Sequence, residues 1–347
     1  MEIIRNLIFM KGLQLFAGTL NTNVTTDSGL SVENKTFYDR TLLESAKPNL
    51  IHSQFGQKRP IPKNGGKKIE FRRYGALPKA LTPLTEGVTP DGRKLTVTAI
   101  EAEVHQYGDY VALSDVLDLT AIDNNVLEAT KAIGNQAGLT LDTITRNILQ
   151  AGTNVQYCPK ITTSGTTAVT TRKGLDATCK LTVDMVKRAV ATLKANNVPK
   201  IGGDYVGIIH PYAAYDLMSD PKWEDMHKYT NPENMYEGEI GRIAGVRFVE
   251  TSEALIVKSS TETSDASTAI SVFCTLILGD NAYGITEVTG GGLKTIIKQL
   301  GSAGTADPLD QRSTVGWKAM QTAEILQQNY MVRVESGGAF SDTATVN

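Results

Sequence analysis

Cysteine and histidine are scarce in this chain, with three cysteines and four histidines among 347 residues. Cys158, Cys179 and Cys274 lie far apart, and no His-Glu-x-x-His or Cys/His cluster occurs. An odd number of widely spaced cysteines is more typical of reduced, partly buried thiols in a cytoplasmic protein than of a disulfide framework. The sequence therefore predicts no metal site.

The motifs of common enzymes are also missing. There is no Gly-x-Ser-x-Gly elbow, no Gly-x-Gly-x-x-Gly and no phosphate-binding Gly-x-x-x-x-Gly-Lys-Ser/Thr. The best candidates for catalytic groups are His210, at the end of a strand, and the pair Glu101 and Glu103, which lie two residues apart on another strand. His210 is better interpreted as a histidine in a turn, and the two glutamates as the solvent-exposed side of a strand. We therefore expect no catalytic residue and no cofactor.

Charge of one sign and long apolar runs are absent as well. Lysine plus arginine number 35 against 37 for aspartate plus glutamate, and aromatic residues make up 6%. This balance argues against tight nucleic-acid binding but leaves weak contact with nucleic acid open. No run approaches the ~20 apolar residues of a membrane span. Nor do the first sixteen residues form an export signal, since Glu2 and Lys11 interrupt the apolar pattern.

An extended arm is the first positive feature. Residues 31–46 predict a helix, and half of the twelve prolines fall between residues 48 and 90. Residues 67–74 and 95–104 alternate like two strands of a hairpin, and the prolines, glycines and threonines between them predict a tip that builds no core. An isolated two-stranded hairpin is marginally stable, so something outside it must support it.

A long amphipathic helix is expected at residues 124–150, where apolar residues recur every three or four positions. Its apolar stripe includes Ile133 and Ile144, which we expect to pack against closing strands around Val315, Trp317 and Val332. From residue 182 helices and strands alternate, which predicts one α/β module. Residues 151–181 read as a surface loop with short strands.

Two late segments carry a family resemblance. Residues 241–251 read Gly-Arg-Ile-Ala-Gly-Val-Arg-Phe-Val-Glu-Thr, and residues 306–318 read Ala-Asp-Pro-Leu-Asp-Gln-Arg-Ser-Thr-Val-Gly-Trp-Lys. With Leu13-Gln-Leu-Phe-Ala and Lys67-Lys-Ile-Glu-Phe-Arg-Arg, they resemble the major capsid proteins of tailed double-stranded DNA bacteriophages. The resemblance implies the Hong Kong 97-type capsid fold, of class α+β.

The resemblance also implies a division of the chain. We expect an N-terminal arm (1–30), a helix with its lead-in (31–66) and an extended hairpin loop (67–106). These are followed by a peripheral domain (107–180) with a spine helix at 124–150, an axial α/β domain (181–299), and closing strands of the peripheral domain (300–347).

Assembly contacts are expected at the hairpin, where residues 67–94 carry seven basic against three acidic residues. A basic face favours docking on an acidic surface of the next subunit, with a solvated hairpin face as the alternative. The predicted contact residues are Lys67, Lys68, Arg72, Arg73, Lys79, Arg93 and Lys94. The predicted core residues are Ile133, Ile144 and Trp317.

The partners implied are copies of the chain, as hexamers and pentamers of an icosahedral shell, together with a separate scaffolding protein, a portal, a decoration protein and weakly held packaged DNA. The implied location is the virion, after assembly in the host cytoplasm. Two alternatives stay open: an encapsulin-like nanocompartment shell, and an α/β enzyme with a pocket of titratable groups.

Overall fold

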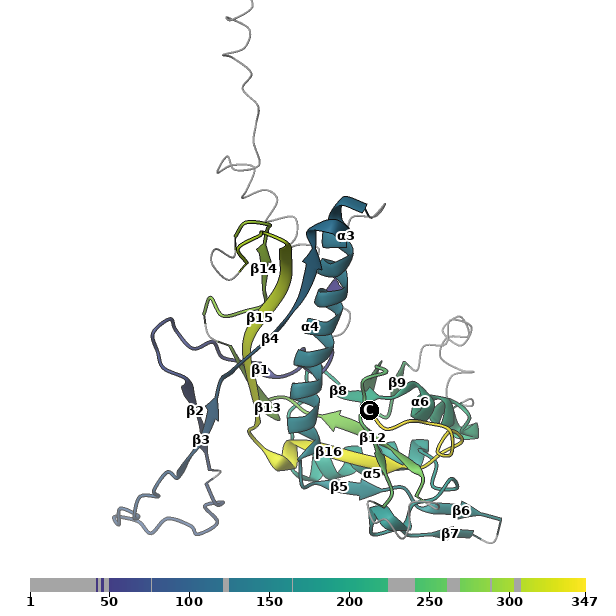
Figure 1. Ribbon diagram of the computed structural model, residues 1–347. Helices are drawn as coiled ribbons and strands as arrows, with labels where there is room; N and C mark the ends of the chain where they lie inside the picture. Colours follow the sequence, from purple (N-terminus) through teal and green to yellow (C-terminus); the bar gives the residue numbers. More distant parts are fainter. Residues whose placement is uncertain are drawn as a thin grey trace, which may run out of the picture.

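Two large β-sheets, one long helix and a projecting hairpin dominate the described part of the molecule (Figure 1). The structure is a computed structural model that describes residues 42, 45–46, 50–75, 77–120, 125–163, 165–223, 241–260, 269–287, 289–302 and 307–347. The expected arm at 1–30 lies outside these residues. Of the expected helix at 31–46, only residues 42, 45 and 46 are described; they are helical, and Leu42 is buried.

Helix α4 (Asn125–Gln150) confirms the predicted long helix. Its buried side consists of two rows at steps of four residues, one of which contains Ile133, Ala137, Leu141 and Leu149. The other row includes Gly134, where a side chain would collide with the backbone of Leu42. Small residues therefore let the N-terminal segment lie close against this helix.

A five-stranded sheet covers the buried side of α4. Its order is β1-β13-β15-β14, and β4 pairs with the opposite edge of the long strand β15. The bounds are β1 (Gln57–Lys58), β4 (His105–Ser114), β13 (Tyr283–Glu287), β14 (Lys294–Lys298) and β15 (Arg312–Ile325). Alternate residues Val315, Trp317 and Ala319 of β15 face the helix and pack with Ile133 and Ala137.

A seven-stranded sheet forms the second body. Its order is β5-β16-β12-β8-β10-β9, with β11 also paired to β12. The bounds are β5 (Val155–Tyr157), β8 (Tyr205–Ile209), β9 (Arg242–Ile243), β10 (Val246–Glu250), β11 (Ile256–Lys258), β12 (Ser271–Leu278) and β16 (Met331–Ser336). Strands β8 and β12 are buried along their whole length, as expected for central strands covered on both faces.

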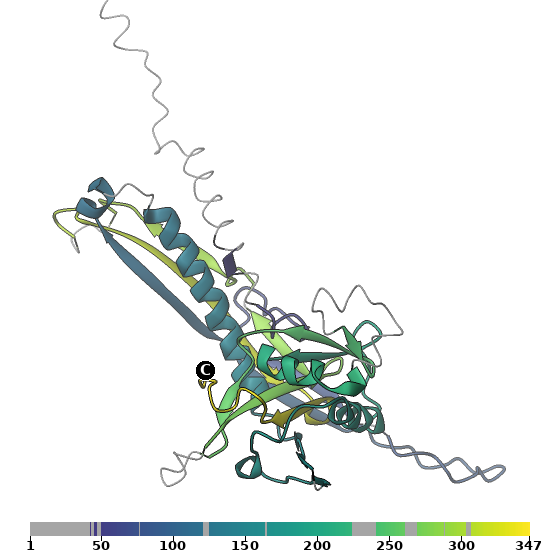
Figure 2. The ribbon, with the colours of Figure 1, turned by 90° about the vertical axis from the view of Figure 1, so that its right-hand side faces the viewer.

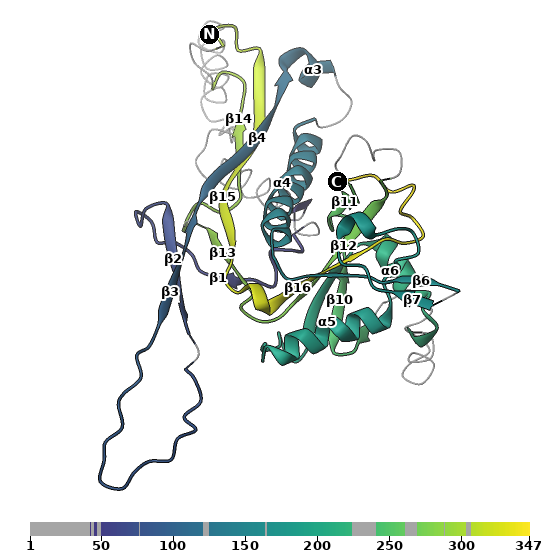
Figure 3. The same ribbon diagram turned by 90° about the horizontal axis from the view of Figure 1, so that it is seen from below.

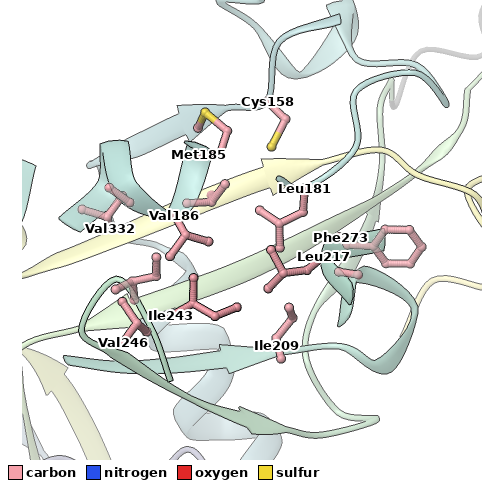
Figure 4. Packing of buried hydrophobic residues seen from close by; sticks show 14 of the residues in the cluster. Cys158, Leu181, Met185, Val186, Ile209, Leu217, Ile243, Val246, Phe273 and Val332 are labelled. Carbon is pink, nitrogen blue, oxygen red and sulfur yellow. The ribbon is translucent and has the colours of Figure 1, made fainter. Parts of the chain in front are cut away.

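The two faces of this sheet bury different clusters. Helices α5 (Val183–Ala195) and α6 (Pro211–Met218) pack on one face, where Val186, Leu217 and Phe273 belong to one buried cluster, part of which Figure 4 shows. On the other face, Ile208 and Leu276 contact Leu149 and Tyr283. Because Leu149 belongs to α4 and Tyr283 to β13, this second cluster joins the two bodies of the molecule.

Short elements complete the described part of the chain. They are α3 (Asp115–Thr120), β6 (Lys160–Thr162), β7 (Gly165–Thr167) and the 3-10 turns η2 (Arg172–Gly174) and η5 (Gln328–Tyr330). Strands β2 (Lys68–Tyr74) and β3 (Val97–Glu103) form the expected hairpin, which leaves the body in Figures 2 and 3.

The sheet topology corrects the expected grouping of three strands. Strands β13 and β14, placed by sequence with the α/β module of 181–299, belong to the five-stranded sheet through pairing with β15. Strand β16, expected to return to the long helix, is instead a strand of the seven-stranded sheet between β12 and β5. Consequently Val332 packs with α5 and not with α4. Local patterns reveal strands but not their distant hydrogen-bond partners.

Candidate assembly surfaces

The hairpin is fixed at its base by a few apolar residues. Strands β2 and β3 pair from Lys68–Glu103 to Tyr74–Val97. Phe71 and Ala102 are buried, and the ring of Phe71 lies over Gly284 of β13 so closely that a Cβ there would be 2.7 Å from it. The guanidinium of Arg59 lies 5.7 Å from the centre of the same ring. The base is therefore anchored on the five-stranded sheet.

The tip has no such anchor. Every described residue from 77 to 99 is exposed. Large apolar side chains are among them: Leu81 is 82% exposed and Leu84 is 77% exposed, with Leu77, Val88 and Leu95 each above half. The prediction that the tip builds no core of its own holds, but its description as prolines, glycines and threonines missed these leucines. Exposed apolar side chains gathered on one loop are typical of a protein-binding segment.

The seven predicted contact residues lie along this hairpin, and all are exposed. Lys68 is 3.5 Å from Glu101, and Arg72 is 3.0 Å from Glu70. The hydrogen bond from Arg72 to Glu70 raises the pKa of the guanidinium further. Lys67, Arg73, Lys79, Arg93 and Lys94 make no ion pair with any carboxylate in the described part of the chain. Most of the positive charge is thus available to a partner.

The three residues considered as candidate catalytic groups, Glu101, Glu103 and His210, have ordinary structural roles. Glu101 and Glu103 are exposed on β3, and Glu101 pairs with Lys68. His210 is the N-cap of α6, and its Nδ1 accepts a hydrogen bond from the backbone N–H of Tyr212 at 3.1 Å. Burial lowers the pKa of this imidazole, so it remains a neutral acceptor at neutral pH.

The predicted core residues behave differently from one another. Ile133 and Trp317 are 2% and 3% exposed and share one cluster between α4 and the sheet. Ile144 is only half-buried and is absent from that cluster, which corrects its expected place in the core. The buried rows of α4 advance by four residues, from Leu141 to Thr145, and Ile144 lies beside them.

Gln136 ties the same helix to two strands. Its amide donates to Asp109 of β4 at 2.7 Å, and its carbonyl oxygen accepts from Nε1 of Trp317 at 3.2 Å. The hydrogen bond from Gln136, followed by that from the backbone N–H of Tyr110, lowers the pKa of Asp109. The indole of Trp317 therefore has the partner that a buried indole N–H requires.

A buried pair that the sequence did not single out fixes the N-terminal lead-in. His52 and Asp142 are fully buried, and Nδ1 of His52 lies 2.6 Å from the Asp142 carboxylate. The backbone N–H of His52 donates to the same carboxylate at 2.7 Å, and the hydroxyl of Tyr283 donates to the carbonyl of His52. One residue thereby connects α4, β13 and the lead-in. Ninety positions separate His52 from Asp142, so no local pattern indicates the pair.

The groups that could do chemistry are shielded. All three cysteines are free and at most 2% exposed, and burial raises the pKa of the Cys274 thiol to about 12. Such thiols are protonated at neutral pH and react slowly. In the described residues, no three His, Cys, Asp or Glu side chains gather as metal ligands, and no helix has the length and apolarity to cross a bilayer.

A profile of the family described as phage capsid protein matches residues 89–300, more than half of the chain. The chain belongs to the phage capsid protein family. No curated protein matches the sequence. This capsid protein is nevertheless similar to solved capsid structures that share 13–14% of its residues.

Three of these structures match over most of both chains. The capsid of Cyanophage P-SCSP1u has a TM-score of 0.63 at 14% identity, covering 84% of this capsid protein and 89% of the other chain. The capsid of Ralstonia phage GP4 has a TM-score of 0.62 at 14% identity, covering 84% of this capsid protein and 88% of the other chain. The Cyanophage Pam1 capsid has a TM-score of 0.61 at 13% identity, covering 86% of this capsid protein and 93% of the other chain. The fold is the α+β Hong Kong 97-type capsid fold, and the protein is a major capsid protein, a structural component of the virion.

Proposed function

We propose that this major capsid protein assembles into hexamers and pentamers that close an icosahedral shell around double-stranded DNA, and that the hairpin is a principal contact between subunits. The observation that carries the proposal is the exposed tip. Leucines that are 56–82% exposed gain stability only when a partner covers them. The partner in a shell of identical subunits is the next copy.

Charge supports the same role for the hairpin base. Five of the seven basic residues have no carboxylate partner among the described residues, so they are available to pair with an acidic surface of the neighbour. Complementary charge favours correct register and fast association more than raw affinity. Within this scheme, the named contact residues are Lys67, Lys68, Arg72, Arg73, Lys79, Arg93 and Lys94.

The domain roles follow the corrected topology. We infer that α4 and the five-stranded sheet form the peripheral domain, and that the seven-stranded sheet with α5 and α6 forms the axial domain. Under this assignment β13 and β14 pass to the peripheral domain and β16 to the axial domain. The shared cluster around Leu149 and Tyr283 supports a stiff connection between them.

The remaining partners belong to the same proposal. A net charge of −2 suits weak, non-specific contact with packaged DNA and not tight binding. A separate scaffolding protein and a portal would direct assembly in the host cytoplasm, and a decoration protein would bind the finished shell. The family match favours this scheme over an encapsulin-like compartment, which encloses protein cargo.

Electron microscopy of the purified full-length protein tests the proposal. Expression with its phage's head genes should yield closed icosahedral particles that hold nuclease-resistant DNA. Particles that enclose only protein would favour the encapsulin-like alternative. A protein that stays a small soluble oligomer under all assembly conditions would refute the shell function.

A further inference from the structure

An open hollow lies on the face of the five-stranded sheet that points away from α4. Gly316 of β15 lies in register between Tyr110 of β4 and Ile296 of β14. A hollow of about 510 Å³ surrounds this glycine, and the bordering side chains of Tyr110 and Ile296 are 68% and 36% exposed. The comparable Gly284 is covered by the ring of Phe71, whereas the nearest atoms above Gly316 belong to the neighbouring strand β4.

Three lysines lie on the same face of the sheet as this hollow. Side chains alternate along a strand, so Lys294, Lys298 and Lys318 share the face of Ile296 and Gly316. Lys294 and Lys318 are directly opposite each other, an arrangement that is destabilising for like charges. None of the three forms an ion pair with a carboxylate in the described ranges. An acidic partner would relieve this repulsion.

A matching surface exists at α3 of the same chain. Val116 and Leu117 of this helix are 62% and 45% exposed, and the helix also contains Asp115 and Asp118. From Leu95 to Thr130 the sequence contains no lysine or arginine. Helix α3 therefore offers apolar side chains in an acidic setting, the complement of an apolar hollow with lysines on the same face.

The helix cannot reach the hollow of its own chain. Asp115 follows Tyr110 by five residues along an extended strand, roughly 16 Å at 3.3 Å per residue. Figure 1 shows α3 and β14 at the same end of the molecule, so both surfaces are presented together. A contact between two different surfaces of identical chains is heterologous, and it closes into a ring when the rotation divides a full turn.

We propose that α3 of one subunit docks in the Tyr110–Ile296–Gly316 hollow of another, with Asp115 beside Lys294 and Lys318. The proposal rests on the proposed shell function and adds a second contact, at the part of the sheet where β4, β15 and β14 lie side by side. The basic hairpin of a neighbour is a poorer occupant, because its lysines and arginines would meet the lysines on this face.

Crosslinking in assembled particles tests the pairing directly. The native cysteines are buried, so Leu117→Cys with Ile296→Cys supplies the only exposed thiols among the described residues. Mild oxidation should give a ladder of covalent multimers on a non-reducing gel, and each single substitution should give none. A ladder from Leu84→Cys with Ile296→Cys, and none from the first pair, would assign the hollow to the hairpin and overturn the proposal.

Failure of the inference and failure of the shell function are distinguishable. If the unmodified protein forms shells and the Leu117–Ile296 pair gives no ladder, only the α3 contact is refuted. If no shells form from the unmodified protein, the proposed function itself fails.

A charge swap gives an independent readout. Lys318→Glu and Asp115→Lys should each lower the yield of particles at least about tenfold, since like charges would then face each other across the contact. The two substitutions combined should restore most of the yield. Lys187→Glu on α5, another exposed lysine, serves as the matched control. A double variant as defective as either single variant, or single variants that lose only DNA content, would overturn the pairing.

Discussion

The hairpin and the α4 region use their apolar residues in opposite ways. Ile133 and Trp317 are almost fully buried between helix and sheet, whereas Leu81 and Leu84 of the hairpin are more than three-quarters exposed. The first arrangement stabilises one subunit by itself. Under the proposed function, the second arrangement contributes stability only when a neighbour covers it, so experiments on the two regions should separate folding from assembly.

Deleting the hairpin tip is expected to have the largest effect. Replacing residues 75–93 by a short turn removes Leu77, Leu81 and Leu84 but leaves Phe71 and Ala102 in place. We expect shell assembly to be abolished while the midpoint of thermal unfolding stays close to that of the full-length subunit. Electron microscopy and calorimetry measure the two quantities. A parallel loss of stability and assembly would place the tip in the subunit's own core.

Asp142→Ala should instead destabilise the folded subunit, because it disturbs the contacts of the N-terminal lead-in. The substitution leaves the buried backbone N–H and imidazole of His52 without their acceptor. An orphaned buried group costs about 1–3 kcal/mol, so the free energy of unfolding should fall by about 2–5 kcal/mol. Chemical denaturation of the isolated subunit measures the change. Asp184→Ala, which removes an exposed carboxylate of α5, is the comparison and should cost less.

Truncation of the α4 stripe distinguishes its two isoleucines. Ile133→Ala should lower the free energy of unfolding by about 2–5 kcal/mol, as buried large-to-small substitutions do. Ile144→Ala should cost clearly less, because that side chain is half-buried and outside the cluster. Equal losses at the two positions would contradict this division. Normal stability of Ile133→Ala combined with failed assembly would mean that the stripe faces a neighbour.

The smallest effect is expected from charge alone. Reversing Arg72 and Arg73 to glutamate should lower particle yield at low salt, with the difference from the unmodified protein shrinking as salt increases. Exposed charges are screened within roughly 10 Å at ~0.1 M salt. The adjacent exposed pair Lys187 and Arg188 on α5, reversed in the same way, is the matched control. Normal assembly of the hairpin variant at low salt would mean that its basic face is only solvated.

Several features followed from the sequence by local rules. The steps of three and four residues predicted α4 almost to the residue, because a helix repeats every 3.6 residues wherever it packs. The alternation in β2 and β3 and the apolar run of β8 were equally readable. Strand β4 was missed, since its residues are mostly exposed and show no clean alternation of apolar and polar types.

Tertiary structure alone decided which strands share a sheet and which polar groups pair inside. Strand β16 joins β12, β14 joins β15, and His52 meets Asp142 across ninety positions. Hydrogen-bond partners of a strand are chosen by the packing of the whole chain, and the sequence around a strand carries little of that information. The sequence by itself determined most of the elements, their order and the family; only the fold determined the two sheets and their joining cluster. It alone revealed that the leucines of the hairpin tip are exposed and that an open hollow lies at Gly316.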